Sequence, residues 1–105
     1  MATTVVEVGV DGVYEGRDRI HAAIIRYNRG FEGTGPGLPY GQYNHHMQLQ
    51  PVVTVDEDGV TARARSREWA LLGQYEEFAA WKTTIMENVF KKEDGVWKIA
   101  AMRIY

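Results

Sequence analysis

The sequence contains no cysteine among its 105 residues. This absence excludes disulfides, thiol nucleophiles and the cysteine-based zinc and iron–sulfur sites. The chain also lacks a long apolar run, and its N-terminus lacks a basic segment followed by a hydrophobic one. We therefore expect neither a transmembrane span nor a secretory signal. These absences suit a cytoplasmic protein, which is our prediction for its location.

Neither sign of charge dominates the sequence. The chain has 12 lysines and arginines against 14 aspartates and glutamates, a formal net charge of -2. The basic residues are scattered or interleaved with acidic ones, so we expect no nucleic-acid partner and no membrane partner. With 45% hydrophobic and 25% charged residues, the chain is typical of one globular domain covering residues 1–105.

The first part of the chain predicts a small hairpin followed by one helix. Residues 3–10 are rich in β-branched side chains, and turn residues begin at Asp11. Apolar residues from Ile20 to Tyr27 recur with the spacing i, i+3, i+4 and i+7, which predicts an amphipathic helix ending near Gly30.

The rest of the chain reads as a long loop followed by strands. Residues 31–42 carry four glycines and two of the three prolines, which is loop chemistry. Four long antiparallel strands are then expected at 43–55, 60–72, 79–92 and 96–105. The order predicts an α+β fold: a curved antiparallel sheet of four long strands plus a short hairpin, wrapped around one main helix.

One side of two neighbouring predicted strands carries arginines and aromatic residues. The alternating residues are Arg63, Arg65, Arg67 and Trp69 on one strand and Trp81, Thr83, Ile85, Glu87 and Val89 on the next. Aromatic residues and arginine with few lysines are typical of an oligomer interface. We therefore predict a homodimer through the face carrying Arg65, Trp69, Trp81 and Glu87. The alternative is a solvated sheet face with two amphipathic tryptophans.

Two adjacent histidines lie in the first long strand, where neighbouring side chains point to opposite faces. His45 falls on the side of the apolar Met47 and Leu49, and His46 falls on the side of the amides. We therefore expect His45 to line an apolar pocket and His46 to face away from it. Pro51 cannot donate a ladder hydrogen bond and is a candidate for a bulge, which swaps the faces after it.

A histidine in an apolar cavity is a competent proton acceptor near neutral pH if a carboxylate or a tyrosine orients it. The residues that we expect to act in this way are His45, Glu68 and Tyr43. The candidate ligand-binding residues on the pocket wall are Met47, Leu49, Tyr40, Ser66 and Met102. The alternative is a pocket or core histidine with a purely structural role.

No metal site is expected. His45 and His46 diverge as strand neighbours, and His21 on the helix adds no clear third ligand.

The order of elements and several segments carry a resemblance to a known family. The hairpin, the helix entry "YEGRDRI", the glycine-rich loop, "HHMQLQPVVTVDEDGVTARA" and the terminal "VFKKEDGVWKIAAMRIY" resemble the SnoaL-like branch of the nuclear transport factor 2-like superfamily over essentially the whole chain. The resemblance implies a cone-shaped α+β domain. Members include scytalone dehydratase, ketosteroid isomerase, polyketide cyclases and limonene epoxide hydrolase, alongside proteins that only bind or scaffold.

Alignment on scytalone dehydratase implies roles for individual positions. It places His45 at that enzyme's pocket histidine, an acid–base residue in the syn elimination of water. Thr84 and Met86 fall near its pocket serine and asparagine, so the resemblance implies that both bind ligand. Ala70 falls near its second histidine, and the aspartate that orients the first histidine lies in an N-terminal segment that this chain lacks.

Two functional interpretations stay open. The first is a cofactor-independent lyase or isomerase that dehydrates, isomerises or cyclises a hydrophobic or polycyclic small molecule, with His45 as the acid–base residue. The second is a non-catalytic ligand-binding or dimerisation module, or a fragment of a longer protein. Family members usually begin with one or two helices that close the mouth of the cone, and their absence favours the second interpretation. The position of His45 on the apolar face favours the first.

Overall fold

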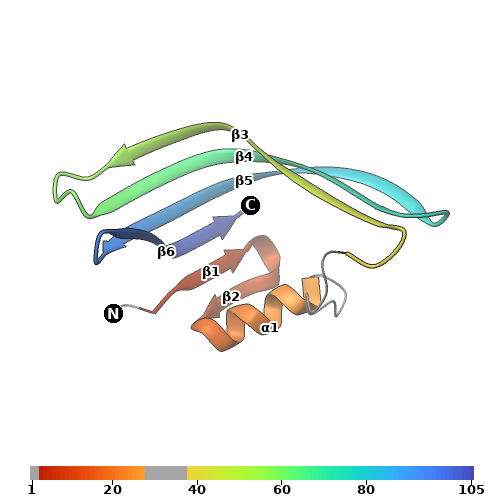
Figure 1. Cartoon of the computed structure of the whole chain (residues 1–105), viewed down its shortest axis with the longest axis horizontal. Helices are drawn as coiled ribbons and strands as arrows, with labels where there is room; N and C mark the ends of the chain where they lie inside the picture. The colour runs from red at the N-terminus through yellow and green to blue at the C-terminus, as the bar shows by residue number, and fades with distance from the viewer. Residues whose placement is uncertain (1–2, 28–37) are drawn as a thin grey trace.

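The computed structural model describes residues 3–27 and 38–105 as one curved sheet with one helix beneath it (Figure 1). The elements are β1 (Val5–Val8), a short 3-10 helix (Gly9–Asp11), β2 (Gly12–Glu15), α1 (Arg17–Tyr27), β3 (Gln42–Val55), β4 (Thr61–Gln74), β5 (Phe78–Glu93) and β6 (Val96–Ile104). Most of the expected glycine-rich loop lies outside the described residues. No helix in the described part of the chain is long and apolar enough to cross a membrane.

All six strands belong to a single sheet with the order β2-β1-β6-β5-β4-β3. The prediction of an α+β fold with a curved sheet and one helix is confirmed, and the sheet has six strands because the short hairpin joins the four long ones. β1 pairs with β6 in parallel, with Val5 opposite Ala101 and Val8 opposite Ile104. Without β1, β6 would be an edge strand. The pairing gives hydrogen-bond partners to backbone N–H and C=O groups of β6 that would otherwise be unpaired. The hairpin thus extends the long sheet.

Sequence-encoded turns join the long strands. In the turn between β3 and β4, the backbone N–H groups of Val60 and Thr61 both donate to Asp58 Oδ1 at 2.9 Å, and Thr61 Oγ1 donates to Asp58 Oδ2 at 2.6 Å. The hydrogen bond from the Thr61 hydroxyl is the largest cause that lowers the pKa of Asp58 below its ordinary value of 3.8. Gly59 follows with a φ of +70°, a conformation that glycine adopts without strain.

A β-bulge interrupts β3 where Pro51 led us to expect one. Leu49 lies opposite Arg67 and Val52 lies opposite Arg65, so β3 has one residue more than β4 in this interval. Gln50 takes a φ of 51°, which accommodates the extra residue. Because side chains alternate along a strand, the bulge reverses which parity faces which side.

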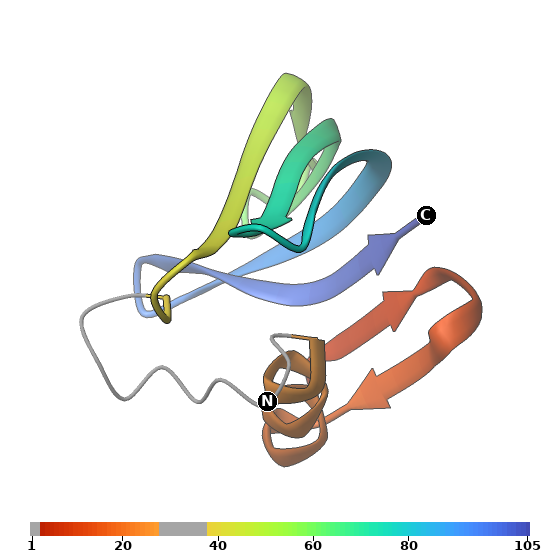
Figure 2. The ribbon, with the colours of Figure 1, turned by 90° about the vertical axis from the view of Figure 1, so that its right-hand side faces the viewer.

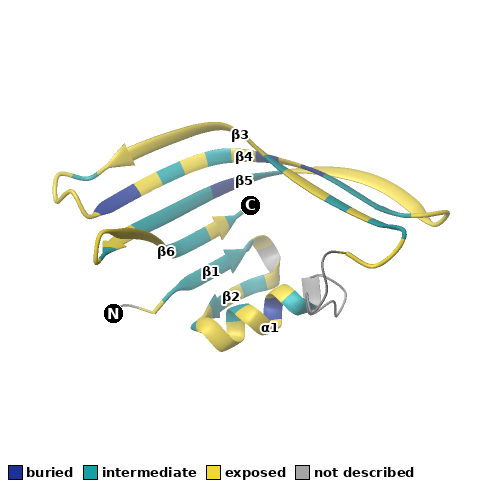
Figure 3. Ribbon diagram, in the orientation of Figure 1, coloured by how far each residue is buried: buried dark blue, intermediate teal, exposed yellow. Residues whose placement is uncertain are grey.

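The sheet curves so that α1 lies on its concave side, near the β1–β2 end (Figure 2). α1 packs mainly against β2, so the sheet is wrapped around the helix only at this end. The buried apolar residues of the described chain are few and mostly small: Ala23, Ala62, Ala70 and Met86. Figure 3 shows long exposed stretches on β3 and on the outer side of α1. Much of the concave face therefore stays accessible to a ligand.

Candidate functional site

A cavity of about 500 Å³ lies between α1 and the concave face of the sheet. Its wall is apolar over most of its extent, and most of its polar side chains come from β2, β3, β4 and β5. The apolar lining residues include Val6, Val8, Ile20, Ala23, Ile24, Leu72, Ile99, Met102 and Ile104, and the polar ones are Thr4, Tyr14, Asn44, His46, Glu68 and Lys82. An apolar cavity with a few convergent polar groups is the usual form of a small-molecule site.

Strand register places the polar groups in the cavity. His46 on β3 lies opposite Ala70 on β4, and Ala70 lies opposite Lys82 on β5. All three side chains therefore share the concave face. Ala70 is fully buried, and His46 and Lys82 line the cavity on either side of it.

Hydrogen bonds hold His46 on both sides of its ring. Nδ1 lies 2.8 Å from Glu68 Oε1, and Nε2 contacts Asn44 Oδ1. A doubly protonated ring satisfies both contacts by donating to two oxygen atoms. The Asn44 amide turned by 180° would present its NH₂ group instead and would suit a neutral ring with Nε2 as acceptor.

The carboxylate of Glu68 joins His46 and Gln48 in one hydrogen-bond network. Glu68 is only 7% exposed, and burying a carboxylate costs free energy unless the carboxylate is paired. Besides the bond to His46, Gln48 Nε2 donates to Glu68 Oε2 at 3.3 Å, and Ser66 Oγ donates to Gln48 Oε1 at 2.8 Å. The imidazole itself keeps 39% of its side-chain surface exposed, so it can meet a ligand. The arrangement is a histidine held by a buried carboxylate at the wall of an apolar cavity.

The expectation that His45 lines the pocket while His46 faces away is wrong. His45 lies opposite Leu71, on the convex face of the sheet, and His46 lines the concave cavity. Tyr43 is on the convex face as well and stacks on His45, with ring centroids 5.9 Å apart. Of the three residues assigned to catalysis, only Glu68 lies in the cavity, and its partner is His46.

The bulge explains this error. The turn pairs Val55 with Ala62, and an unbroken ladder from that pair would place His45 opposite Leu72 on the concave face. The extra residue at Gln50 shifts the register by one, and a shift of one residue turns every side chain to the other face. The apolar residues Met47 and Leu49 follow His45 to the convex side, which is itself rich in aromatic residues.

The remaining candidate ligand-binding residues are divided between the two faces. Met102 lines the cavity, and Ser66 belongs to the hydrogen-bond network beside it. Thr84 and Met86 share the concave face but do not line the cavity, and Met47 and Leu49 lie on the convex face. Tyr40 lies at a different hollow. Ligand binding by these seven residues stays a prediction.

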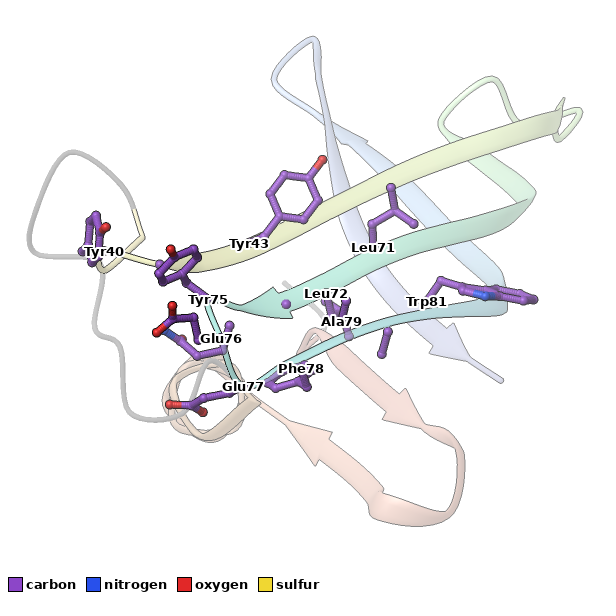
Figure 4. A pocket seen from close by; sticks show the side chains of 14 residues that line it. Tyr40, Tyr43, Leu71, Leu72, Tyr75, Glu76, Glu77, Phe78, Ala79 and Trp81 are labelled. Atoms are coloured by element: carbon purple, nitrogen blue, oxygen red, sulfur yellow. The ribbon is translucent and has the colours of Figure 1, made fainter.

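A second hollow lies at the end of the sheet where β4 and β5 meet (Figure 4). Figure 4 shows Tyr43 and Leu71 on adjacent strands, with Tyr40 before the start of β3 and Tyr75 after the end of β4. Tyr40 is 94% exposed. The lining includes Glu76 and Glu77 but no histidine, so this hollow lacks the acid–base pair that the concave cavity has.

The convex face shows the cross-strand pairs expected from the alternation. Arg65 Nε lies 3.6 Å from Glu87 Oε1, and the rings of Trp69 and Trp81 meet edge to face with centroids 6.5 Å apart. Trp81 is 69% exposed. The pairing is therefore confirmed, and the homodimer stays a prediction.

Sequence reasoning missed Asn44, His46 and Lys82 as site residues. The sequence contained one signal for this face. Asn44, His46 and Gln48 are polar residues on one side of β3, and they can hydrogen-bond the polar residues Ser66 and Glu68 on one side of β4. The small residues of β4 mark the same face, and His46 reaches it only through the bulge.

A family model described as a SnoaL-like domain matches residues 2–103. Among solved structures, Aln2 from a Streptomyces species is 15% identical, with a TM-score of 0.78 over 99% of this chain and 69% of that one. A hexachlorocyclohexane dehydrochlorinase is 14% identical, with a TM-score of 0.69 over 97% of this chain and 63% of that one. The association domain of C. elegans CaMKII is 14% identical, with a TM-score of 0.67 over 99% of this chain and 72% of that one. No curated protein sequence matches the chain.

Proposed function

The chain belongs to the SnoaL-like domain family, and we propose that it is a cofactor-independent acid–base enzyme acting on a small hydrophobic molecule in the concave cavity. The observation that carries this proposal is the contact of 2.8 Å between His46 Nδ1 and Glu68 Oε1 at the wall of an apolar cavity. An imidazole that acts as a general base needs one nitrogen accessible to the substrate and a partner at the other nitrogen that orients the ring. Glu68 orients His46 at Nδ1, the ring is 39% exposed, and Nε2 becomes available once Asn44 is displaced from it.

In the proposed reaction Nε2 of His46 takes a proton from carbon or oxygen of the substrate. Glu68 accepts the Nδ1–H hydrogen bond, fixes the tautomer and stabilises the imidazolium that forms. The substrate takes the place of Asn44 at Nε2, and the Asn44 amide is then free to hydrogen-bond the substrate. Return of the proton to another atom gives isomerisation, and loss of a leaving group gives elimination. A dehydrochlorinase with the same fold is consistent with the second outcome.

The test uses 5-nitrobenzisoxazole, a small aromatic probe of general bases. The base removes the proton at C3, the C–H electron pair forms the nitrile, and the N–O bond breaks to release a coloured phenolate. We expect saturable turnover faster than that of free imidazole at the same pH. His46→Ala should reduce the rate by about 10²- to 10⁴-fold, the usual contribution of general base catalysis.

His45→Ala is the matched control, since the two histidines are neighbours in sequence and lie on opposite faces. It should leave the rate unchanged. Equal rates for the wild type and His46→Ala would contradict the enzyme and favour a module that only binds its ligand.

We also propose that the chain forms a homodimer through the convex face. Trp69 and Trp81 are exposed there and share the face with the Arg65–Glu87 pair, a composition typical of interface centres. A dimer of this kind leaves the concave cavity of each subunit open.

A further inference from the structure

We propose that Lys82 binds an anionic oxygen of the substrate, so that the cavity selects apolar ring compounds carrying a carboxylate, phenolate or enolate group. This inference names the substrate class of the proposed site and rests on the proposed function for the identity of that site. It starts from the position of one charged side chain in an apolar cavity.

Lys82 is the only lysine or arginine among the described residues that line the concave cavity. Lys82 is an exposed residue, so its side chain lines a part of the cavity that solvent reaches. Ala70 lies between Lys82 and His46 in the strand register and is fully buried, and both of these polar side chains line the cavity.

No described residue forms an ion pair with Lys82. The ion pairs of the described chain join His46 to Glu68, Arg63 to Asp56, Arg65 to Glu87, Lys98 to Glu93 and Arg103 to Glu7. Glu68, the acidic residue of the cavity, directs both carboxylate oxygens toward β3: Oε1 to His46 and Oε2 to Gln48. Lys82 extends from β5 on the other side of Ala70. The cation of the cavity is thus available to a ligand.

The geometry also defines where the anion lies relative to the reacting atom. His46, Ala70 and Lys82 occupy three successive strands at one level, which separates the outer two backbones by about 10 Å, two strand spacings. An apolar ring in the cavity can therefore meet the base at one edge and the ammonium group at the other. An anionic oxygen that gains charge during proton removal would be stabilised there, as electrostatic catalysis requires.

The inference predicts a preference for an anion over a neutral molecule of the same shape. The probes are 2-naphthoate and 2-naphthamide, with binding measured by calorimetry at neutral pH. We expect the carboxylate to bind about tenfold more tightly than the amide, the order of one charge-assisted hydrogen bond. Lys82→Met keeps the apolar stem and removes the charge. It should abolish the preference and leave the affinity for 2-naphthamide within about twofold.

Two further variants distinguish the charge of Lys82 from its packing. Lys82→Arg keeps the charge and should keep a preference for the carboxylate, which a purely structural role of the lysine would not require. Arg67→Met removes a cation of the convex face and should leave both affinities unchanged. Thermal melting of each variant shows whether it is folded.

A carboxylate preference that survives Lys82→Met would overturn the inference, and so would the absence of any preference in the wild type. Failure of catalysis is a separate result, because these measurements need no turnover. If His46→Ala does not change turnover of the isoxazole but Lys82→Met removes the carboxylate preference, the cavity recognises anions without being the acid–base site.

Discussion

The pairing of His46 with Glu68 predicts a measurable coupling between two residues 22 positions apart. The perturbation is a double-mutant cycle of His46→Ala and Glu68→Gln, with the free energy of unfolding measured by denaturant titration. The two atoms are 2.8 Å apart, and the side chains are 39% and 9% exposed. Hydrogen bonds to charged groups contribute about 1.5–3 kcal/mol when buried, and exposed pairs contribute about 0.2–1 kcal/mol. For a pair with one partner buried we expect a coupling of about 1 kcal/mol.

This coupling corresponds to a shift of roughly 4–8 °C in Tm for a domain of this size. The single change Glu68→Gln should also lower turnover of 5-nitrobenzisoxazole, because glutamine cannot stabilise the imidazolium as a carboxylate does. Its effect should fall on kcat more than on KM, since Glu68 acts through His46 and is almost fully buried.

The same cycle with His45→Ala is the control. His45 and Glu68 lie on opposite faces of the sheet, so their coupling should be within about 0.3–0.5 kcal/mol of zero. A coupling of His46 with Glu68 no larger than that of His45 would refute the assignment of the concave face and, with it, the proposed base.

Two further predictions concern the convex face and the first turn of the long hairpins. Trp81→Ser should convert a homodimer into a monomer in sedimentation velocity, since it removes an exposed aromatic residue from the proposed interface; a wild-type monomer at micromolar concentration would contradict the dimer. Asp58→Ala should lower Tm at pH 7, and Glu57→Ala in the same turn is the control. Because folding lowers the pKa of Asp58 below 3.8, its stabilisation is present above pH 3.8 and is lost as the pH falls through the folded value. The gap in Tm between Asp58→Ala and the wild type should therefore close in acid, and a gap that stays constant as the pH falls well below 3.8 would argue against the turn carboxylate as its cause.

Sequence patterns were sufficient to predict the elements of this domain. The bounds of the long strands agree with the predicted ones to within two residues, and α1 includes the stretch from Ile20 to Tyr27 whose spacing predicted a helix. Such patterns are reliable because they depend on local chemistry: strict alternation in β4, turn residues before Gly59 and Gly95, and helical spacing in α1. The parallel contact between β1 and β6 was not predicted, because it joins residues 96 positions apart, such as Val5 and Ala101, and leaves no local signal.

The sequence by itself also determined that the two histidines face opposite sides of the sheet, and alternation along β4 puts Glu68 on the same side as Ser66 and Ala70. Only the tertiary structure decided which histidine joins them. That choice depends on a single extra residue at Gln50, whose bulge shifts the pairing of β3 with β4 by one position. Alternation along a strand is a local property, whereas register between strands is a property of the assembled sheet. His46, and not His45, therefore meets Glu68 in the cavity.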